Sequence, residues 1–293
     1  MNIIVLSRNP SLYSTQSLVN AARRRNHYVR VFDHMHCDLI IEDEKPAIYY
    51  HGQRIKNIDA VIPRIGSSAT TYGANVIRQF ELLHVFSTLR SDSLLNSRDK
   101  ISCMQLLAKH NIKVPKSTIS NNLMSTEQLL KEVGPMPAVI KLVNGTHGMG
   151  VILAEKEKTA EAIIESFHKT KQKVFLQKFI ADAKGADVRV FIIDNEIVGV
   201  MKRQAKEGEF RSNLHRGASA EVIMLNEEEM EVAKKAARVL GLKVAGVDML
   251  QTKEGPMILE VNASPGLEGI ETVTGKDIAV KIITYIERNF KYK

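Results

Sequence analysis

The sequence predicts a protein of α/β and α+β domains, and three features support this fold class. Apolar runs at residues 2–6 and 28–32 flank a helical stretch at about 14–25, which is the βαβ order of an α/β domain. From residue 138 onward, short apolar runs follow one another across tight turns, which is typical of antiparallel hairpins. A chain of 293 residues is also long enough for roughly two or three domains.

The N-terminal elements continue with a hairpin at 47–55 and a strand at 59–66 that runs into a loop. Residues 73–90 have helical periodicity. A second helix is predicted at 98–110, with Ser97 as its N-cap, Asp99 in its first turn and Asn111 after its end. We therefore place a domain boundary near residue 95.

The rest of the chain alternates strands with helices and is predicted to form two further domains. Its predicted strands are 138–143, 151–155, 174–180, 187–194 and 196–204, followed by a hairpin within 247–266. Its predicted helices are 157–170, 227–240 and 275–290. The predicted domains are 1–95, 96–176 and 177–293.

The hairpin at 247–266 carries Asp248, Glu260 and Asn262 on otherwise apolar strands. Pairing across its turn sets Asp248 opposite Glu260, and the strand period of two puts Asn262 on the same face. Three oxygen donors on one face suit a hard divalent cation, either Mg²⁺ or Mn²⁺. The alternative is two solvated acids and a turn amide, but the apolar neighbours indicate burial, where acids without a cation are costly.

Lys141 lies in an apolar strand directly before the glycine-rich loop 144–150. Backbone N–H groups of such a loop can approach phosphate oxygens, and the strand lysine can neutralise them. The loop matches neither the P-loop nor the G-x-G-x-x-G fingerprint, so an ordinary hairpin turn remains an alternative.

Two strand ends carry further candidate residues. The run from Gln177 through Lys178 and Phe179 to Ile180 could offer backbone groups to a base edge, or it is an ordinary strand end. Asp187 shares a face with Arg189, and an acid so placed could hold a ribose hydroxyl. Pairing of these two side chains at the surface is the alternative.

A polar cluster lies between residues 202 and 217 and is poorly suited to a core. Clustered guanidiniums bind carboxylates and phosphates in bidentate fashion, although a solvated loop is the alternative. The loop after the hairpin is tightened by a proline and two glycines, and it can direct Ser264 toward a substrate carboxylate. The members of the cluster are Lys202, Arg203, Arg211, Ser212, Asn213, His215 and Arg216.

Composition excludes several classes of protein. No apolar run approaches the roughly 18 residues that span a bilayer, and the N-terminus does not resemble a signal peptide. Two cysteines cannot form a disulfide framework, so we expect a cytoplasmic protein. The net charge of +8 favours acidic partners. Aromatic residues are only 5% and no zinc-finger spacing occurs, which argues against a sequence-specific nucleic-acid reader.

The order of these motifs resembles the ATP-grasp superfamily, and the likeness extends through essentially the whole chain. The branch it resembles is the RimK-type α-L-glutamate ligases. The matching motifs are SRNPSLYS, VIPRIG, SRDKISCMQLLAKHNI, IKLVNGTHGMGV, AKEGEFRSNLHRGA, VAGVDML and EVNASPGLEGIETVTG. RGA at 216–218 departs from the second glycine that we expect after Gly217. The resemblance implies an ATP-grasp fold, with ATP between two α+β subdomains and an N-terminal α/β (pre-ATP-grasp) domain.

The resemblance also implies roles for the residues at matching positions. Lys100 and Lys141 contact ATP phosphates, and Asp187 binds ribose. The adenine is lined by Gln177, Lys178, Phe179 and Ile180, while Arg211, Ser212 and Asn213 reach the nucleotide. Two divalent ions are held by Asp248, Glu260 and Asn262, and the transferring phosphoryl group is stabilised by Arg203 and Arg211. As anchors for substrate carboxylates we expect Arg189, His215, Arg216 and Ser264. In the N-terminal domain, Arg64 is our one candidate.

The implied activity is that of an ADP-forming acid–amino-acid ligase. A substrate carboxylate attacks the γ-phosphate of ATP, and the amino group of L-glutamate then attacks the acyl phosphate. Members of the family modify the C-terminus of the small-subunit ribosomal protein numbered six, so we expect an acidic protein tail as acceptor, and poly-α-glutamate synthesis is an additional activity.

Two alternatives stay open. The same chemistry could act on a small-molecule or amino-group-carrier acceptor, or the chain could be a non-catalytic ATP-binding or ribosome-associated module. The resemblance further implies a homo-oligomer, with a tetramer as the expected form and no membrane partner.

Overall fold

The N-terminal region forms the predicted α/β unit in the computed structural model, which describes all residues except 44, 121–125, 143–149, 171–172, 215–216 and 291–293. Four parallel strands form its sheet, and both faces are covered, as is usual for parallel strands. In sheet order they are β2 (Tyr28–Phe32), β1 (Asn2–Leu6), β6 (Ala60–Pro63) and β7 (Phe86–Ser87). Helix α1 (Tyr13–Arg24) connects β1 to β2 and completes the predicted βαβ start.

A small antiparallel sheet follows β2 and confirms the predicted hairpin at 47–55. Its turn residues His51 and Gly52 have φ of 47° and 75°, the left-handed geometry that a two-residue hairpin turn needs. It is preceded by the short helix η1 (His34–His36). The strands are β3 (Cys37–Ile40), β4 (Ala47–Tyr50) and β5 (Gln53–Arg54).

Two helix predictions in this region need correction. Helix α2 (Thr70–Leu82) ends at Leu82 rather than at residue 90, because His84 adopts a left-handed φ of 55° and the chain then enters β7. The second predicted helix begins at Lys100 as α4 (Lys100–Lys109). Its N-cap is Asp99, whose carboxylate accepts from the backbone N–H groups of Ile101 and Ser102. Ser97 belongs to the separate helix α3 (Ser91–Arg98) and bonds back to a carbonyl there.

The second sheet has the strand order β10-β9-β11-β8, and all its pairs are antiparallel. Two helices pack on it around a small apolar core that includes Leu130, Ile140 and Ile164. The strand predicted at 174–180 ends at Lys178, so Phe179 and Ile180 follow the strand. Its elements are β8 (Ser117–Ser120), α5 (Thr126–Val133), β9 (Ala138–Leu142), β10 (Val151–Ala154), α6 (Glu157–Lys169) and β11 (Val174–Lys178).

The third sheet contains the hairpin with the acidic residues and confirms its predicted register. Asp248 is opposite Glu260, and Gly246 is opposite Asn262, with an irregularity just beyond Asp248. The sheet order is β14 (Ser219–Glu221), β13 (Glu196–Gln204), β12 (Ala186–Ile193), β15 (Val244–Leu250) and β16 (Met257–Asn262).

Helices cover both faces of this third sheet, and the period of two decides which side chains each meets. Val190 and Val247 join a core with α7 (Glu227–Val239), whereas Phe191 joins one with α8 (Glu268–Thr274) and α9 (Ile278–Asn289). Helix α7 starts in a capping box between Asn226 and Glu229. Asp187 and Asp248 lie on the face that α8 and α9 cover, at the end of the sheet beyond the buried Phe191.

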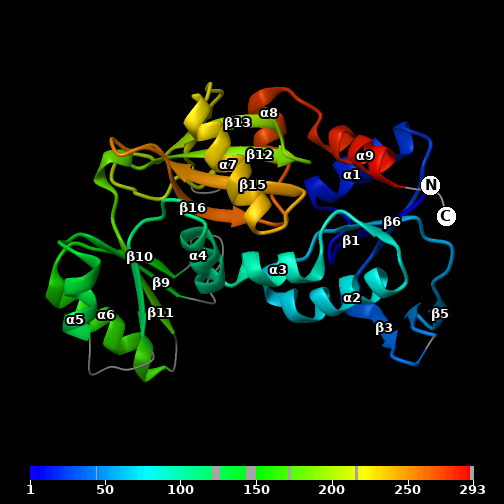
Figure 1. Ribbon diagram of the computed structural model, residues 1–293, viewed down its shortest axis with the longest axis horizontal. Coiled ribbons are helices and arrows are strands. Elements are labelled where there is room, and N and C mark those ends of the chain that lie inside the picture. The colour runs from blue at the N-terminus through cyan, green and yellow to red at the C-terminus, as the bar shows by residue number, and fades with distance from the viewer. Residues whose placement is uncertain (44, 121–125, 143–149, 171–172, 215–216, 291–293) are drawn as a thin grey trace.

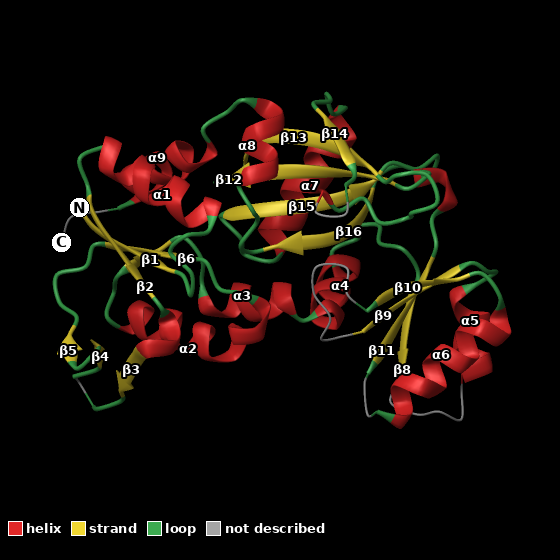
Figure 2. Ribbon diagram, turned by 180° about the vertical axis from the view of Figure 1, so that it is seen from behind, coloured by secondary structure: helices red, strands yellow, loops and turns green. Residues whose placement is uncertain are grey.

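In Figure 1 the five-stranded sheet lies uppermost, with the parallel sheet below it on one side and the sheet of β8 to β11 below it on the other. Helix α4 contacts β16 and lies between that strand and the end of β9 in both ribbon views (Figure 2). Helix α9 returns to pack on α1, where Arg24 pairs with Asp277 at 2.5 Å and Arg25 with Glu287 at 2.6 Å. The site residues therefore gather where α4, β9 and β16 meet.

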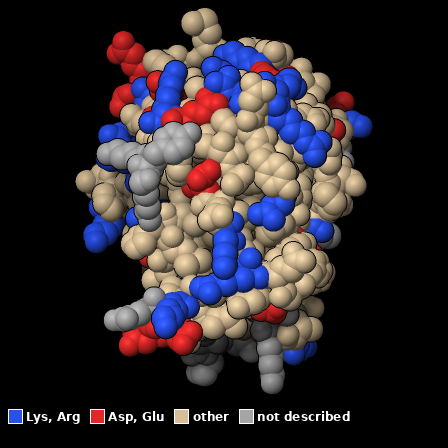
Figure 3. All heavy atoms as spheres, turned by 90° about the vertical axis from the view of Figure 1, so that its right-hand side faces the viewer, with Lys and Arg blue, Asp and Glu red and all other residues tan. Residues whose placement is uncertain are grey.

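The predicted division into 1–95, 96–176 and 177–293 remains a prediction, and its second boundary falls within β11. No helix among the described residues is long and apolar enough to cross a membrane. On the face in Figure 3, Lys and Arg side chains form several separate groups interspersed with Asp and Glu. Cys37 and Cys103 are both buried and unpaired.

Candidate active site

Four charged side chains form a cross-strand cluster on one face of the five-stranded sheet. Register places Arg203 opposite Asp187 and Arg189 opposite Asp248. Arg203 donates from Nε to Asp187 Oδ1 at 2.7 Å, and its Nη2 bonds the other Asp187 oxygen and lies 3.1 Å from Asp248 Oδ2. Arg189 binds Asp248 through both oxygens, with Nε to Oδ1 at 2.6 Å. The proposed surface pairing of Asp187 with Arg189 is therefore wrong, because each of them pairs across the strands.

The arginines supply the positive charge that buried acids require. Asp187, Arg203 and Asp248 are only 7%, 5% and 6% exposed. Burial opposes the Asp248 carboxylate, but the guanidiniums of Arg189 and Arg203 outweigh it and lower its pKa. Burial and the nearby Asp248 charge raise the pKa of Asp187. Burial at Asp248 therefore does not by itself require a metal ion, contrary to the reasoning from the sequence.

The candidate metal donors are nevertheless together on this face. With its amide oxygen toward Arg189, Asn262 donates from Nδ2 to Glu260 Oε1 at 2.9 Å and accepts from Arg189 Nη2 at 3.3 Å. Within the described residues no three His, Cys, Asp or Glu side chains group as metal ligands, so the amide is needed to complete the set. Two carboxylates and an amide oxygen fit Mg²⁺. An ion here would share Asp248 with Arg189.

Lys141 is held in place by a partly buried chain of hydrogen bonds. Its Nζ donates to Gln177 Oε1 at 2.6 Å, and Gln177 Nε2 donates to Ser117 Oγ at 3.0 Å. Burial lowers the pKa of Lys141 to about 8. The Gln177 side chain is only 2% exposed and is engaged with Lys141, so it orients the lysine. Only the backbone groups of Gln177 are then left to contact the expected adenine base. Sequence reasoning missed Ser117, which carries no motif signal.

Most of the glycine-rich loop lies outside the described residues, but its last residue is described. Gly150 has φ of +73°, and a Cβ there would lie 2.7 Å from Leu142 Cδ1. Its carbonyl accepts from the Leu142 N–H at 2.9 Å. The end of the loop therefore needs glycine both for its backbone conformation and for close packing.

The start of α4 brings further cations to the hairpin. The pKa values of Arg98 and Lys100 are both lowered by burial. The negative charge of Glu260 opposes this lowering in part. Glu260 acts on Lys141 in the same direction. Three cations, on α3, α4 and β9, are thus close enough to interact electrostatically with the Glu260 carboxylate of the acidic hairpin.

The loop after β13 is fixed by its own charges. Arg211 donates to Glu209 through Nε at 2.9 Å and Nη2 at 2.7 Å, and its Nη1 reaches Val151 O at 3.4 Å. Hydrogen bonds from Arg211 lower the pKa of Glu209 to about 2. The Ser212 side chain opposes the rise in the pKa of Asp187, so this loop lies next to the cluster. Glu209 was not identified from the sequence.

The remaining predicted residues are partly placed. Lys178 is exposed, and Phe179 and Ile180 are half-buried after the end of β11. Asn213 is half-buried in the loop beside Ser212. His215 and Arg216 lie outside the described residues. A hollow of about 150 Å³ beside Asp187 is lined by Asp182, Ala183, Lys184, Ala186, Asp187, Val188, Lys202, Gln204 and Gln251.

The loop after β16 meets the N-terminal domain. Ser264 Oγ lies 3.4 Å from Pro63 O, and Arg64 Nη2 donates to Pro265 O at 2.7 Å. Arg98 Nη2 donates to Ile65 O at 2.7 Å. Sequence reasoning named Arg64 but missed Arg98, although both lie in motifs, VIPRIG and SRDK, that carry the resemblance.

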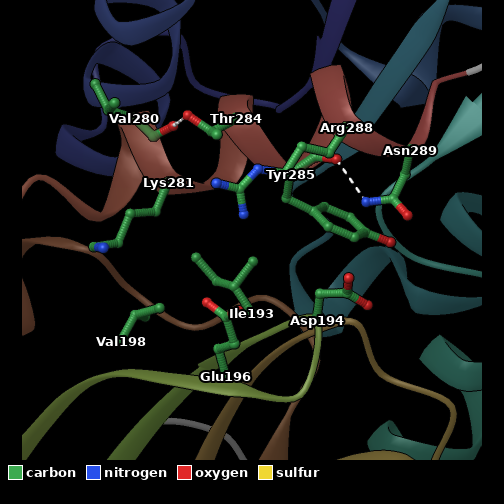
Figure 4. A pocket seen from close by; sticks show the side chains of 10 residues that line it. All are labelled: Ile193, Asp194, Glu196, Val198, Val280, Lys281, Thr284, Tyr285, Arg288 and Asn289. Atoms are coloured by element: carbon green, nitrogen blue, oxygen red, sulfur yellow. Dashed lines mark hydrogen bonds between the residues drawn. The ribbon is translucent and has the colours of Figure 1, made fainter.

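A separate cavity of about 310 Å³ lies between α9 and the β12–β13 turn. Figure 4 shows Asp194, Tyr285 and Arg288 around it, and none of the predicted site residues lines it. It is at the opposite end of β12 from Asp187. This cavity is not part of the candidate active site.

The two larger antiparallel sheets, the strand lysine and the acidic hairpin define an ATP-grasp enzyme as the class of protein. A family model described as the RimK-like ATP-grasp domain matches residues 97–286, and one described as the RimK PreATP-grasp domain matches residues 1–94. The chain belongs to this RimK-like ATP-grasp family. It is an ATP-dependent carboxylate–amine ligase of a family that uses ATP and Mg²⁺.

Similar curated proteins cover almost the whole chain. It is 49% identical over 291 residues to a probable alpha-L-glutamate ligase of Vibrio parahaemolyticus, with 99% of this chain and 97% of the relative covered. It is 50% identical over 289 residues to a protein of the same name from Nitrosococcus oceani, covering 99% and 96%.

Solved structures support the fold at lower identity. The ATP-grasp ligase PsnB complexed with a minimal precursor has a TM-score of 0.76 at 22% identity, with 98% of both chains covered. A RimK domain ATP-grasp protein from Sphaerobacter thermophilus has a TM-score of 0.73 at 18% identity, covering 98% of this chain and 100% of that one.

Proposed function

We propose that this protein is an α-L-glutamate ligase that joins L-glutamate to an acidic acceptor through an acyl phosphate. The observation that carries the proposal is the convergence of Lys100 and Lys141 on the acidic hairpin of Asp248, Glu260 and Asn262. Phosphoryl transfer to a carboxylate joins two anions, so it needs positioned cations more than a nucleophilic side chain. The names of the relatives, each close to half identical over nearly the full length, support glutamate as the amino acid.

The protein's own residues would hold the nucleotide. Lys141, oriented by Gln177, and Lys100 bind phosphate oxygens. Backbone groups at 177–180 border the adenine, and Asp187 accepts from a ribose hydroxyl through lone pairs that Arg203 and Ser212 leave free. Arg203 and Arg211 stabilise charge on the transferring phosphoryl group. Arg189, Ser264, His215 and Arg216 are the proposed anchors for substrate carboxylates.

Asp248, Glu260 and Asn262 would hold two divalent ions, Mg²⁺ or Mn²⁺, which when bound neutralise phosphate oxygens. The acceptor carboxylate oxygen forms a bond to the γ-phosphorus, and the bond from that phosphorus to ADP breaks. The glutamate nitrogen then bonds the acyl carbon, the bond from that carbon to phosphate breaks, and the amine loses a proton. The products are an amide, ADP and phosphate.

The proposed acceptor is the C-terminal glutamate of the small-subunit ribosomal protein numbered six, with poly-α-glutamate as a further product. PsnB has been solved in complex with a precursor peptide, and this supports a peptide acceptor. The alternative is a small-molecule or amino-group-carrier acceptor. A cytoplasmic location and a homo-oligomeric, tetrameric form belong to the same proposal.

The test is incubation with ATP, Mg²⁺ and labelled L-glutamate, with separate arms for the ribosomal protein, an amino-group carrier protein, a glutamyl dipeptide and no acceptor. We expect label in the ribosomal protein and matching ADP release, with Lys141→Met as the inactive control. Label only in the carrier arm would select the alternative. The ligase proposal fails if no arm gains label while ATP still binds.

A further inference from the structure

We propose, on the basis of the function proposed above, that Arg64 and Arg98 form a subsite for a non-reacting carboxylate of a glutamate substrate. Two glutamates enter the reaction, one free and one at the acceptor terminus. Only one of their carboxylates is activated, so the others stay charged and need cationic partners. The carboxylate at this subsite comes either from free L-glutamate or from the acceptor terminus, and the experiment separates these two sources.

The two guanidiniums are brought together by backbone contacts. Arg64 follows β6 and donates from Nη2 to Pro265 O at 2.7 Å. This bond connects it to the loop after the acidic hairpin of β15 and β16. Arg98 ends α3 and donates from Nη2 to Ile65 O at 2.7 Å. Because Ile65 is the residue after Arg64, Arg98 is anchored on the backbone segment from which the Arg64 side chain extends. Burial lowers the pKa of Arg64, and the nearby Arg98 charge lowers it further.

These arginines differ from the other arginines of the site in lacking an acid. Arg189, Arg203 and Arg211 each bind a carboxylate through two nitrogens. In the part of the chain that the structure describes, neither Arg64 nor Arg98 forms an ion pair, and Arg98 Nε is buried without a partner.

Both side chains are half-buried, and burial without an acid is unfavourable for a guanidinium. Burial, reinforced by the Arg98 charge, lowers the pKa of Arg64 to about 10, and burial also lowers that of Arg98. A carboxylate matches the guanidinium fork and would satisfy both charges and donors at once. The pair is therefore preorganised for an anion that the described chain does not supply.

The position beside the reacting groups favours a substrate carboxylate. A Cβ placed on Gly246 would lie 2.7 Å from Pro265 Cβ and 3.8 Å from Arg189 Cδ, so the loop that holds Arg64 packs next to Arg189. On the other side, Glu260 acts electrostatically on Arg98. The ATP phosphates already have Lys100 and Lys141, which leaves the arginine pair for the amino-acid side of the site.

The experiment compares Arg64→Gln and Arg98→Gln with wild type, using Arg90→Gln as the matched control because Arg90 is an exposed arginine at the start of α3. KM is measured separately for L-glutamate, the acceptor and ATP. Loss of a charge-assisted hydrogen bond should raise KM for one acidic substrate about ten- to a hundredfold. The preference for glutamate over glutamine at that position should fall, and KM for ATP should change by less than about twofold.

The substrate affected identifies the source. A higher KM for free L-glutamate alone assigns the subsite to the incoming amino acid, and a higher KM for the acceptor alone assigns it to the acceptor terminus. The inference is overturned if neither KM moves more than about twofold, or if only the KM for ATP rises. Arg64→Lys and Arg98→Lys keep the charge but lose the fork, so they should give intermediate KM values and carry the test if the Gln variants do not fold.

Calorimetry distinguishes failure of this inference from failure of the proposed function. L-glutamate and the dipeptide Glu-Glu are titrated into the full chain with ADP and Mg²⁺. A wild type that transfers no label but binds one of these ligands, with binding lost in Arg64→Gln, refutes the ligase function and keeps the subsite. An active wild type whose Gln variants bind and react normally refutes only the subsite.

Discussion

The lowered pKa of Lys141 predicts a specific pH dependence of ATP binding. Burial brings this pKa to about 8, and phosphate oxygens would raise it again on binding, because they favour the charged lysine. The Lys141 contribution to ATP affinity is therefore fully present well below pH 8, where the lysine is charged. It is lost as the pH rises through that value. The protonated fraction of free Lys141 falls from about 0.9 at pH 7 to about 0.1 at pH 9, so Kd should rise about tenfold.

The assay is calorimetric titration with a non-hydrolysable ATP analogue and Mg²⁺ at pH values from 7 to 9. Lys141→Arg is the control for titration, because an arginine stays charged and should give a nearly flat profile whatever its absolute affinity. Lys158→Gln, at an exposed lysine of α6 outside the proposed site, should keep the wild-type slope. A wild-type Kd that stays within about twofold, or an equally steep Lys141→Arg profile, would refute the assignment of the titration to Lys141.

Three further changes test the site and the packing beneath it. Arg203→Met should lower the free energy of unfolding at pH 7 by about 3–5 kcal/mol in urea denaturation, because it leaves buried acid without its partner, and adding Asp187→Asn should recover part of the loss. Asn262→Ala should abolish label transfer in a single-turnover assay while lowering unfolding free energy by only about 1 kcal/mol. Gly246→Ala should cost about 1–3 kcal/mol of unfolding free energy, because its Cβ would lie 2.7 Å from Pro265.

Each of these has a clear contrary result. Gly66→Ala is the control for Gly246→Ala, since a Cβ at Gly66 meets nothing within 4 Å, and equal losses would dismiss the packing explanation. An Arg203→Met protein as stable as wild type would show that the guanidinium does not offset the buried acids. Full activity of Asn262→Ala would break the two-ion model.

Local patterns in the sequence predicted much of the fold. Alternation of apolar and polar residues, together with the turn, was enough to pair Asp248 with Glu260, because strand side chains have a strict period of two. Propensity was less reliable at helix ends. The helical pattern at 73–90 continued past the left-handed His84, and Ser97 was predicted as the N-cap, with Asp99, the actual N-cap, placed in the first turn. Such boundaries depend on which hydrogen bonds the surrounding structure allows.

The candidate site was predicted as residues but not as contacts. Lys141 and Gln177 were both named, yet only the packing of β9 against β11 shows that the glutamine holds the lysine. Arg189 was expected to bind substrate, which stays a prediction, and the structure adds that it pairs with Asp248. A single sequence gives no measure of which arginine reaches which acid when several lie within a few residues of two strands.

The sequence by itself determined the periodic elements, the register of the acidic hairpin and, through motif resemblance, the family. These are local properties, because a strand's period and a turn's geometry depend on residues close along the chain. Only the tertiary structure decided the partners of the charges: Arg203 for Asp187, Arg189 for Asp248, and no described acid for Arg64 and Arg98. Charge pairing depends on burial and on distances between segments remote in the sequence, and these exist only after the sheets and α3 have packed together.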